Sequence, residues 1–135
     1  MTTGLSRTRQ EENRVGIVLS IEELTDLVKR VLAAHGMSHG NAQFVAAVIA
    51  AAERDGSSSH GIFRIPGYVS TLKSGWVDGY AVPIVTDAAP GLVVADARNG
   101  FAQVALAAGR ELLAAKARQQ GIAALAIHNS HHFAA

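Results

Sequence analysis

The stretch LVVADARNGFAQVALAAGRELLAAKARQQGIAALAI, residues 92–127, contains the pattern that decides the fold. Its two apolar runs, LVVADA and IAALAI, flank an alanine-rich segment that ends at Gly121. Short apolar runs on either side of a longer helix-forming segment predict a strand–helix–strand unit. Asn99 is a candidate cap for the helix, and IAALAI is expected to be a strand buried on both faces.

A further strand is expected just before this unit. The run VPIVTDA, residues 82–88, is rich in β-branched residues and is followed by the turn-forming pair Pro90-Gly91. This arrangement predicts a hairpin, or at least adjacent strands, with the LVVADA run.

The segments before this hairpin predict three helices, over residues 20–36, 41–56 and about 62–74. Ser20 and Glu23 form the capping-box pattern that marks a helix start. Pro66 is compatible with the third helix because the first four amides of a helix have no intrahelical partner.

The predicted fold class is therefore mixed α/β. A helical hairpin and a third helix come first, and a strand–strand–helix–strand unit follows. We expect three regions along the chain: a disordered tail over 1–16, a helical region over 17–78, and an incomplete mixed α/β region over 79–135.

Composition excludes several classes of function. The 135 residues are 49% apolar, carry a formal net charge of +1 and include no cysteine. The even charge balance offers no basic face for nucleic acid and no polybasic membrane anchor. The absence of cysteine excludes disulfides and thiolate catalysis. With no apolar leader or membrane-length run, a cytoplasmic protein is expected.

The run RDGSSSHGIFRIPGY, residues 54–68, holds the first candidate site. On a helix, His60, Arg64 and Tyr68 would fall four residues apart on one face. Arg64 offers a planar fork of donors that suits a carboxylate, and His60 is a side chain suited to proton transfer near neutrality. Ser59 stands beside His60 and is placed to pass on a proton. The alternative is a plain serine cap before a solvated helix face.

The ending HNSHHFAA, residues 128–135, holds the second candidate site. His128, His131 and His132 are possible ligands of zinc or iron, yet no carboxylate stands nearby and adjacent histidines usually point apart. Surface histidines without a role are the alternative, and we expect no metal. No G-x-G-x-x-G motif follows a strand, and no phosphate-binding P-loop is present.

Several separated motifs resemble one family. Four motifs resemble those of the malate/L-lactate dehydrogenase family and occur in the same order: RDGSSSHGIFRIPGY, SGWVDGYAVP, NGFAQVALAAGRELLAAKA and SHHFAA. The nicotinamide-binding fold of this family differs from the Rossmann fold. GIFRIPGY and SHHFAA are most similar to the branch that reduces Δ1-piperideine-2-carboxylate to L-pipecolate and Δ1-pyrroline-2-carboxylate to L-proline.

The resemblance implies roles for individual residues. Ser59 and His60 match the family's proton-relay pair, and Arg64 matches the arginine that binds the substrate carboxylate. The family segment that lies against the nicotinamide ring of the cofactor corresponds to His132, Phe133, Ala134 and Ala135. The cofactor that the resemblance implies is NADPH, with NADH as the alternative. His132 is also a second candidate for proton transfer, because malate- and lactate-type relatives often use the histidine at that place.

The chain departs from the family in two ways. Ser58 stands where close relatives often carry another histidine. Relatives also continue well beyond residue 135, with a substrate-binding lysine, a carboxylate that completes the relay and most of the pocket for the cofactor's phosphates. We therefore expect this chain to be a truncated enzyme. The full-length enzyme is expected to form a homodimer. A malate- or L-lactate-type dehydrogenase and an inactive fragment that acts as an association module remain alternatives.

Overall fold

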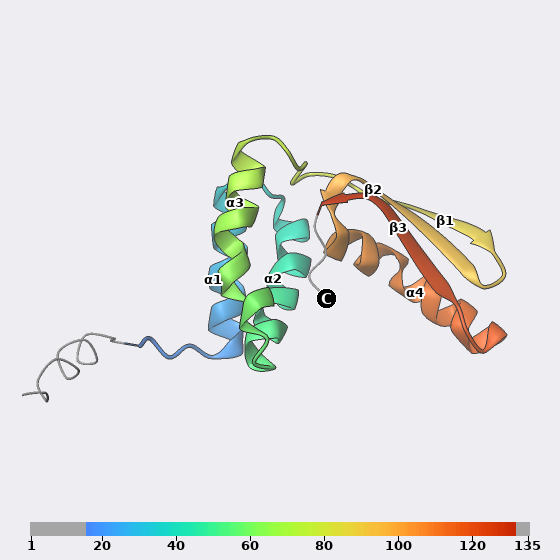
Figure 1. Ribbon diagram of the computed structural model, residues 1–135, viewed down its shortest axis with the longest axis horizontal. Helices are drawn as coiled ribbons and strands as arrows, with labels where there is room; N and C mark the ends of the chain where they lie inside the picture. Colours follow the sequence, from blue (N-terminus) through green and yellow to red (C-terminus); the bar gives the residue numbers. More distant parts are fainter. Residues whose placement is uncertain (1–15, 132–135) are drawn as a thin grey trace, which may run out of the picture.

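Three helices run alternately up and down before the first strand (Figure 1). In the computed structural model, which describes residues 16–131, they are α1 (Ile21–Ala34), α2 (His39–Arg54) and α3 (Ile65–Lys73). The predicted tail therefore lies outside the described residues except for its last position. None of the helices within 16–131 is both long and apolar enough to cross a membrane.

The start of α1 confirms the predicted capping box. The Glu23 amide donates to Ser20 Oγ over 3.1 Å, and the Ser20 amide donates to Glu23 Oε2 over 2.8 Å. Two amides that the helix itself leaves without partners are thus satisfied at the point where α1 begins.

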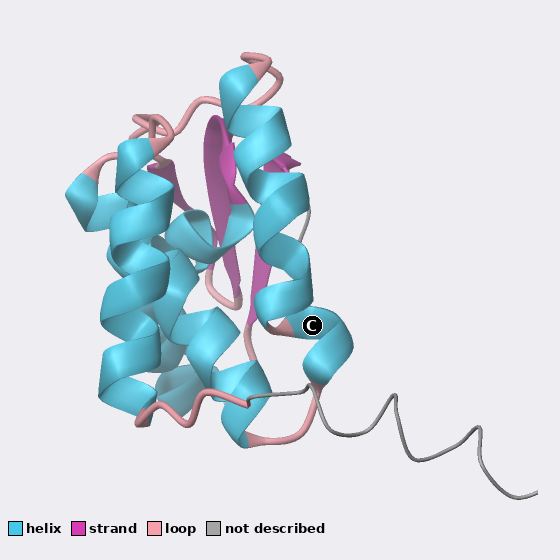
Figure 2. Ribbon diagram, turned by 90° about the vertical axis from the view of Figure 1, so that its left-hand side faces the viewer, coloured by secondary structure: helices cyan, strands magenta, loops and turns pink. Residues whose placement is uncertain are grey.

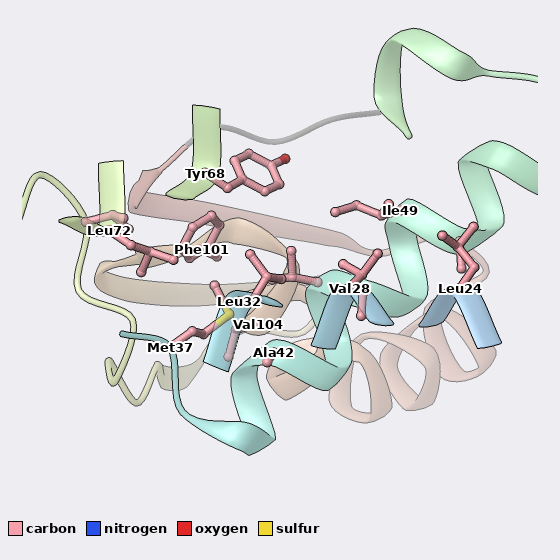
Figure 3. Packing of buried hydrophobic residues seen from close by; sticks show 14 residues of the cluster. Leu24, Val28, Leu32, Met37, Ala42, Ile49, Tyr68, Leu72, Phe101 and Val104 are labelled. Atoms are coloured by element: carbon pink, nitrogen blue, oxygen red, sulfur yellow. The ribbon is translucent and has the colours of Figure 1, made fainter. Parts of the chain in front are cut away.

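The core of the bundle forms where the apolar faces of the three helices meet Phe101 and Val104. Figure 3 shows this cluster, which contains Leu24, Val28, Leu32, Met37, Ala42, Ile49, Tyr68, Leu72, Phe101 and Val104. Because Phe101 and Val104 belong to the second half of the chain, one core joins the helices to the sheet.

The third helix starts later than the sequence predicts. Two short 3-10 turns, Ser58–His60 and Ile62–Arg64, precede α3, and Gly61 separates them with ψ −136°. A single α-helical face through His60 and Tyr68 does not form, so the predicted stripe is wrong. Pro66 does occupy the first turn of α3, as expected.

The second half is a sheet of three strands with one helix against it (Figure 1). The strands β1 (Ile84–Ala89), β2 (Leu92–Phe101) and β3 (Ala124–His131) lie in that order, and α4 (Ala102–Gln120) connects β2 to β3. β1 pairs antiparallel with β2, which confirms the hairpin at residues 90–91. β3 pairs parallel with β2, as a strand–helix–strand unit requires. Seen from the helical side, the bundle stands in front of the sheet (Figure 2).

Two local predictions in this half are wrong. Asn99 does not cap α4: Phe101 occupies the cap position without a side-chain bond, while Asn99 Nδ2 donates to the carbonyl oxygen of Trp76 over 3.1 Å. β3 is not buried on both faces, because α4 covers only one side of the sheet and alternate β3 residues remain exposed.

A buried ammonium fastens α4 to the β1–β2 turn. Lys116 Nζ lies 2.6 Å from Asp87 Oδ1 and donates to the Ala89 carbonyl oxygen over 2.7 Å. The Lys116 side chain is almost fully buried, and these partners offset the cost of removing its ammonium from water.

The link between α3 and β1 is held against the α1–α2 turn. Asn41 Nδ2 donates to the carbonyl oxygens of Gly79 and Ala81, each over 3.0 Å, and the Ser38 amide donates to Gly79 over 3.1 Å. Gly79 is required here, because an added Cβ would overlap the Gly36 carbonyl. These contacts set how the bundle meets the sheet.

We predict that Asn41→Ala lowers the free energy of unfolding by about 1–3 kcal/mol, since it removes two hydrogen bonds worth about 0.5–1.5 kcal/mol each. Urea denaturation followed by circular dichroism measures the change. Gln43→Ala, at an exposed position on the same helix, is the control and should have little effect. Equal denaturation midpoints for the two variants would contradict the role of Asn41.

Candidate active site

The Ser-His pair forms a hydrogen-bonded group within the first 3-10 turn. His60 Nδ1 lies 3.0 Å from Ser59 Oγ and 3.3 Å from Ser57 Oγ. The imidazole is partly buried, and its Nε2 atom is not used by these contacts. The arrangement suits proton exchange between a serine hydroxyl and an imidazole.

A carboxylate from α2 fixes the turn that follows. Glu53 Oε1 accepts from the Ile62 amide over 2.7 Å, and an added Cβ at Gly61 would overlap this carboxylate. The glycine therefore lets Glu53 reach the backbone between the two 3-10 turns. Sequence reasoning missed Glu53, because the contact joins two different elements and no local motif announces it.

Arg64 connects the Ser-His turn to a pocket. Its Nε donates to the Ser59 carbonyl oxygen over 2.8 Å, and within residues 16–131 no carboxylate forms an ion pair with it. Among residues 16–131, no hydrogen bond or ion pair engages the terminal nitrogens of its fork. The pocket has a volume of about 720 Å³ and is lined by Ile62, Phe63, Arg64, Pro66, Gly67, Tyr68, Thr71 and His131.

Two of the lining rings, Tyr68 and His131, are supported by residues that do not themselves line the pocket. Tyr68 and Phe101 meet edge to face with ring centroids 5.1 Å apart, and His131 lies 5.3 Å from Phe101. The buried Gln103 donates through Nε2 to the Tyr68 hydroxyl over 3.2 Å. Burial raises the pKa of the Tyr68 phenol, although the Gln103 bond and the charge of Arg64 act in the opposite direction.

A second carboxylate holds the strand that carries His131. Asp96 Oδ1 accepts from the Arg98 amide over 2.8 Å and from Asn129 Nδ2 over 3.1 Å. The Arg98 bond, followed by the Asn129 bond, lowers the Asp96 pKa. Arg98, Asn99 and Asn129 all have positive φ, at the place where the β2–β3 register shifts. Asp96 thus fastens two bent strands to each other just before His131.

The structure brings together only some of the predicted residues. Arg64 and Tyr68 share the pocket, whereas Ser59 and His60 adjoin it through the Arg64 bond and are not among its described lining residues. His132, Phe133, Ala134 and Ala135 lie outside the described residues. His131, predicted only as a metal ligand or surface histidine, lines the pocket, while His128 is exposed on β3. No three histidine or acidic side chains within 16–131 are placed to hold a metal.

Comparison with known proteins establishes the family. The sequence profile described as malate/L-lactate dehydrogenase matches residues 19–135. The chain belongs to the malate/L-lactate dehydrogenase family. This confirms the resemblance that the separated motifs indicate, and the mixed α/β class is confirmed by solved structures of related dehydrogenases.

Individual relatives include reductases and a dehydrogenase. The chain is 62% identical to the Delta(1)-pyrroline-2-carboxylate/Delta(1)-piperideine-2-carboxylate reductase of Pseudomonas putida, over 84% of this chain and 33% of that protein. The crystal structure of delta1-piperideine-2-carboxylate reductase from Pseudomonas syringae pv. tomato matches with a TM-score of 0.85 and 57% identity, over 89% of this chain and 36% of the other.

Malate dehydrogenase from Pyrococcus horikoshii matches with a TM-score of 0.77 and 29% identity, over 87% of this chain and 34% of the other. The chain therefore spans about a third of the length of the relatives it matches.

We predict that Gly61→Ala displaces the Glu53 carboxylate and speeds hydrogen exchange at the Ile62 amide, because that amide loses its acceptor. Exchange measured by NMR tests this. Gly67→Ala is the matched control, since an added Cβ there meets nothing and alanine suits a helix better than glycine. Unchanged exchange at Ile62 in the Gly61→Ala variant would contradict the role of Glu53.

The raised Tyr68 pKa predicts a loss of stability in alkali. Above about pH 10 the unfolded phenol releases its proton while the folded one keeps it, so the free energy of unfolding falls as the pH rises. Urea denaturation at several alkaline pH values measures the slope. Tyr68→Phe should flatten this fall, whereas Tyr80→Phe, which removes an exposed phenol, should not. A slope that responds to Tyr80 alone would refute the assignment.

Proposed function

We propose that the chain is part of an NAD(P)H-dependent reductase of cyclic imine carboxylates, acting on Δ1-piperideine-2-carboxylate and Δ1-pyrroline-2-carboxylate. The observation that carries the proposal is Arg64, a guanidinium with no carboxylate partner among the described residues, on a pocket next to a Ser-His pair. The named activity of relatives at 57–62% identity supports the same substrate class.

Arg64 would bind the substrate carboxylate. Its Nε is already committed to the Ser59 carbonyl oxygen, so the side chain is held in place before a ligand arrives. A guanidinium fork forms two parallel bonds to a carboxylate and fixes the orientation of the ring. No acidic side chain is among the described lining residues, so the pocket suits an anion.

Ser59 and His60 would handle the proton. Protonation of the imine nitrogen makes the adjacent carbon electrophilic, and an acid at that nitrogen lowers the barrier by roughly 10²–10⁴-fold in rate. His60 exchanges its proton with Ser59 Oγ, which lies 3.0 Å away, and Ser59 is linked through its carbonyl to Arg64. His132 remains the second candidate for this role.

A reduced nicotinamide supplies the hydride when bound. The pocket of about 720 Å³ is larger than a five- or six-membered ring with one carboxylate needs, which leaves room for a second planar ring beside the substrate. NADPH is the proposed form and NADH the alternative, and His132, Phe133, Ala134 and Ala135 are the proposed contacts. A cytoplasmic location and a homodimer complete the proposal; both rest on the sequence and its family resemblance.

The malate- or lactate-type alternative is less well supported. The malate dehydrogenase structure shares 29% identity with the chain, against 57% for the piperideine-2-carboxylate reductase structure. A 2-hydroxyacid dehydrogenase and an imine reductase would each bind the substrate carboxylate with Arg64, so the substrate must be tested directly.

A chimera tests the proposed activity. This chain replaces the matching segment of the Pseudomonas putida reductase, to which it is 62% identical. We expect the chimera to oxidise NADPH faster with the two imine carboxylates than with pyruvate or oxaloacetate. Activity with the keto acids alone would support the malate- or lactate-type reading.

Variants in the same chimera test the residue roles. His60→Ala should lower kcat by about 10²–10⁴-fold, while His39→Ala, at an exposed histidine on α2, should retain it. Normal turnover in His60→Ala would rule out His60 as the acid.

Arg64→Lys should raise KM by about tenfold or more, because an ammonium cannot reproduce the planar fork. Arg30→Lys, at an exposed arginine on α1, is the control. An unchanged KM in Arg64→Lys would exclude Arg64 as the carboxylate ligand.

A further inference from the structure

We propose that His131 is a further ligand-binding residue, whose imidazole contacts the ring nitrogen of a cyclic 2-carboxylate held by Arg64. The inference rests on the proposed function, which supplies the carboxylate at Arg64. It adds a second polar contact from the opposite half of the molecule.

His131 reaches the pocket because of how β2 and β3 pair. Phe101 and His131 are register partners at the ends of two parallel strands, beyond the register shift. Asp96 and Asn129 are joined by a 3.1 Å hydrogen bond where the strands bend, which places the last residue of β3 beside the bundle rather than along the sheet. β3 thus places the His131 imidazole at the seam where the helical bundle meets the sheet.

Two aromatic rings then fix the orientation of that imidazole. His131 meets Phe101 at 87° with centroids 5.3 Å apart, and it meets Tyr68 at 70° with centroids 6.2 Å apart. Tyr68 is itself held by Phe101 and by the Gln103 hydrogen bond, and it is almost fully buried. An imidazole held in this way presents its ring to the pocket at little entropic cost.

The chemistry of the lining favours a ring with a nitrogen beside its carboxylate. Arg64 and His131 are the lining residues in the described chain with strongly polar nitrogen donors, and the rest of the lining is mainly apolar. A guanidinium binds the carboxylate, and an imidazole nitrogen can donate to or accept from a neighbouring ring nitrogen. A cyclic imine carboxylate carries these two groups on adjacent atoms.

Two stable probes separate the contacts. Pyridine-2-carboxylate has an sp² ring nitrogen next to its carboxylate, as the imine does, whereas benzoate has the same ring size and carboxylate without the nitrogen. Binding of each acid to the full 135-residue chain is measured by NMR titration. We expect the chain to bind pyridine-2-carboxylate about 3- to 10-fold more tightly, the worth of one neutral hydrogen bond.

Two matched variants assign that preference. His131→Phe keeps an aromatic ring against Phe101 and Tyr68 but removes both nitrogens, so the two acids should bind equally. His128→Phe makes the same change at an exposed position of β3 and should retain the preference. Retention of the preference in His131→Phe, or its equal loss in His128→Phe, would overturn the inference.

Failure of the proposed function would give a different result. Arg64→Met should weaken both acids alike. If Arg64→Met binds both as tightly as the unmodified chain does, Arg64 does not bind the carboxylate and the proposed function fails, whatever His131→Phe shows. If neither acid binds the unmodified chain, both proposals are overturned.

Discussion

The seam between the helical bundle and the sheet is the contact on which the rest of the structure depends. Tyr68 from α3 packs edge to face against Phe101, and its hydroxyl accepts from the buried Gln103 of α4. Such a ring pair contributes about 0.5–1.5 kcal/mol beyond its apolar area. The pocket lies beside this seam: most of its lining, including Arg64, comes from residues 62–71, and His131 reaches it from the sheet.

In each half, a hydrogen bond between two different structural elements positions the polar groups at this seam. Glu53 on α2 holds the Ile62 amide and so shapes the turns that carry His60 and Arg64. Asp96 on β2 holds Asn129 and so bends the strand that carries His131. Clefts between rigid elements are common places for binding sites, because each wall is set by its own packing.

Local sequence patterns predict the order of helices and strands well. Helix breaks and the burial of strand faces depend on contacts between distant residues, which local patterns do not predict. The capping box at Ser20 and the order of strands and helices follow from neighbouring residues. The break at Gly61 depends on Glu53, and the exposed side of β3 depends on α4 covering one face only. That Arg64 belongs to a candidate site follows from its chemistry and the family motif, and the structure places it on the pocket. The place of His131 on the pocket does not follow from the sequence, because its partner Phe101 lies thirty positions earlier.

The account is tested most directly by nuclear Overhauser effects between the three rings at the seam. Cross-peaks from the His131 ring protons to both Tyr68 and Phe101 are predicted, because all three rings meet edge to face. If the Tyr68–Phe101 cross-peaks appear while those of His131 are absent, the sheet does not deliver that imidazole to the pocket. Absence of all three sets would show that the two halves do not meet in this way.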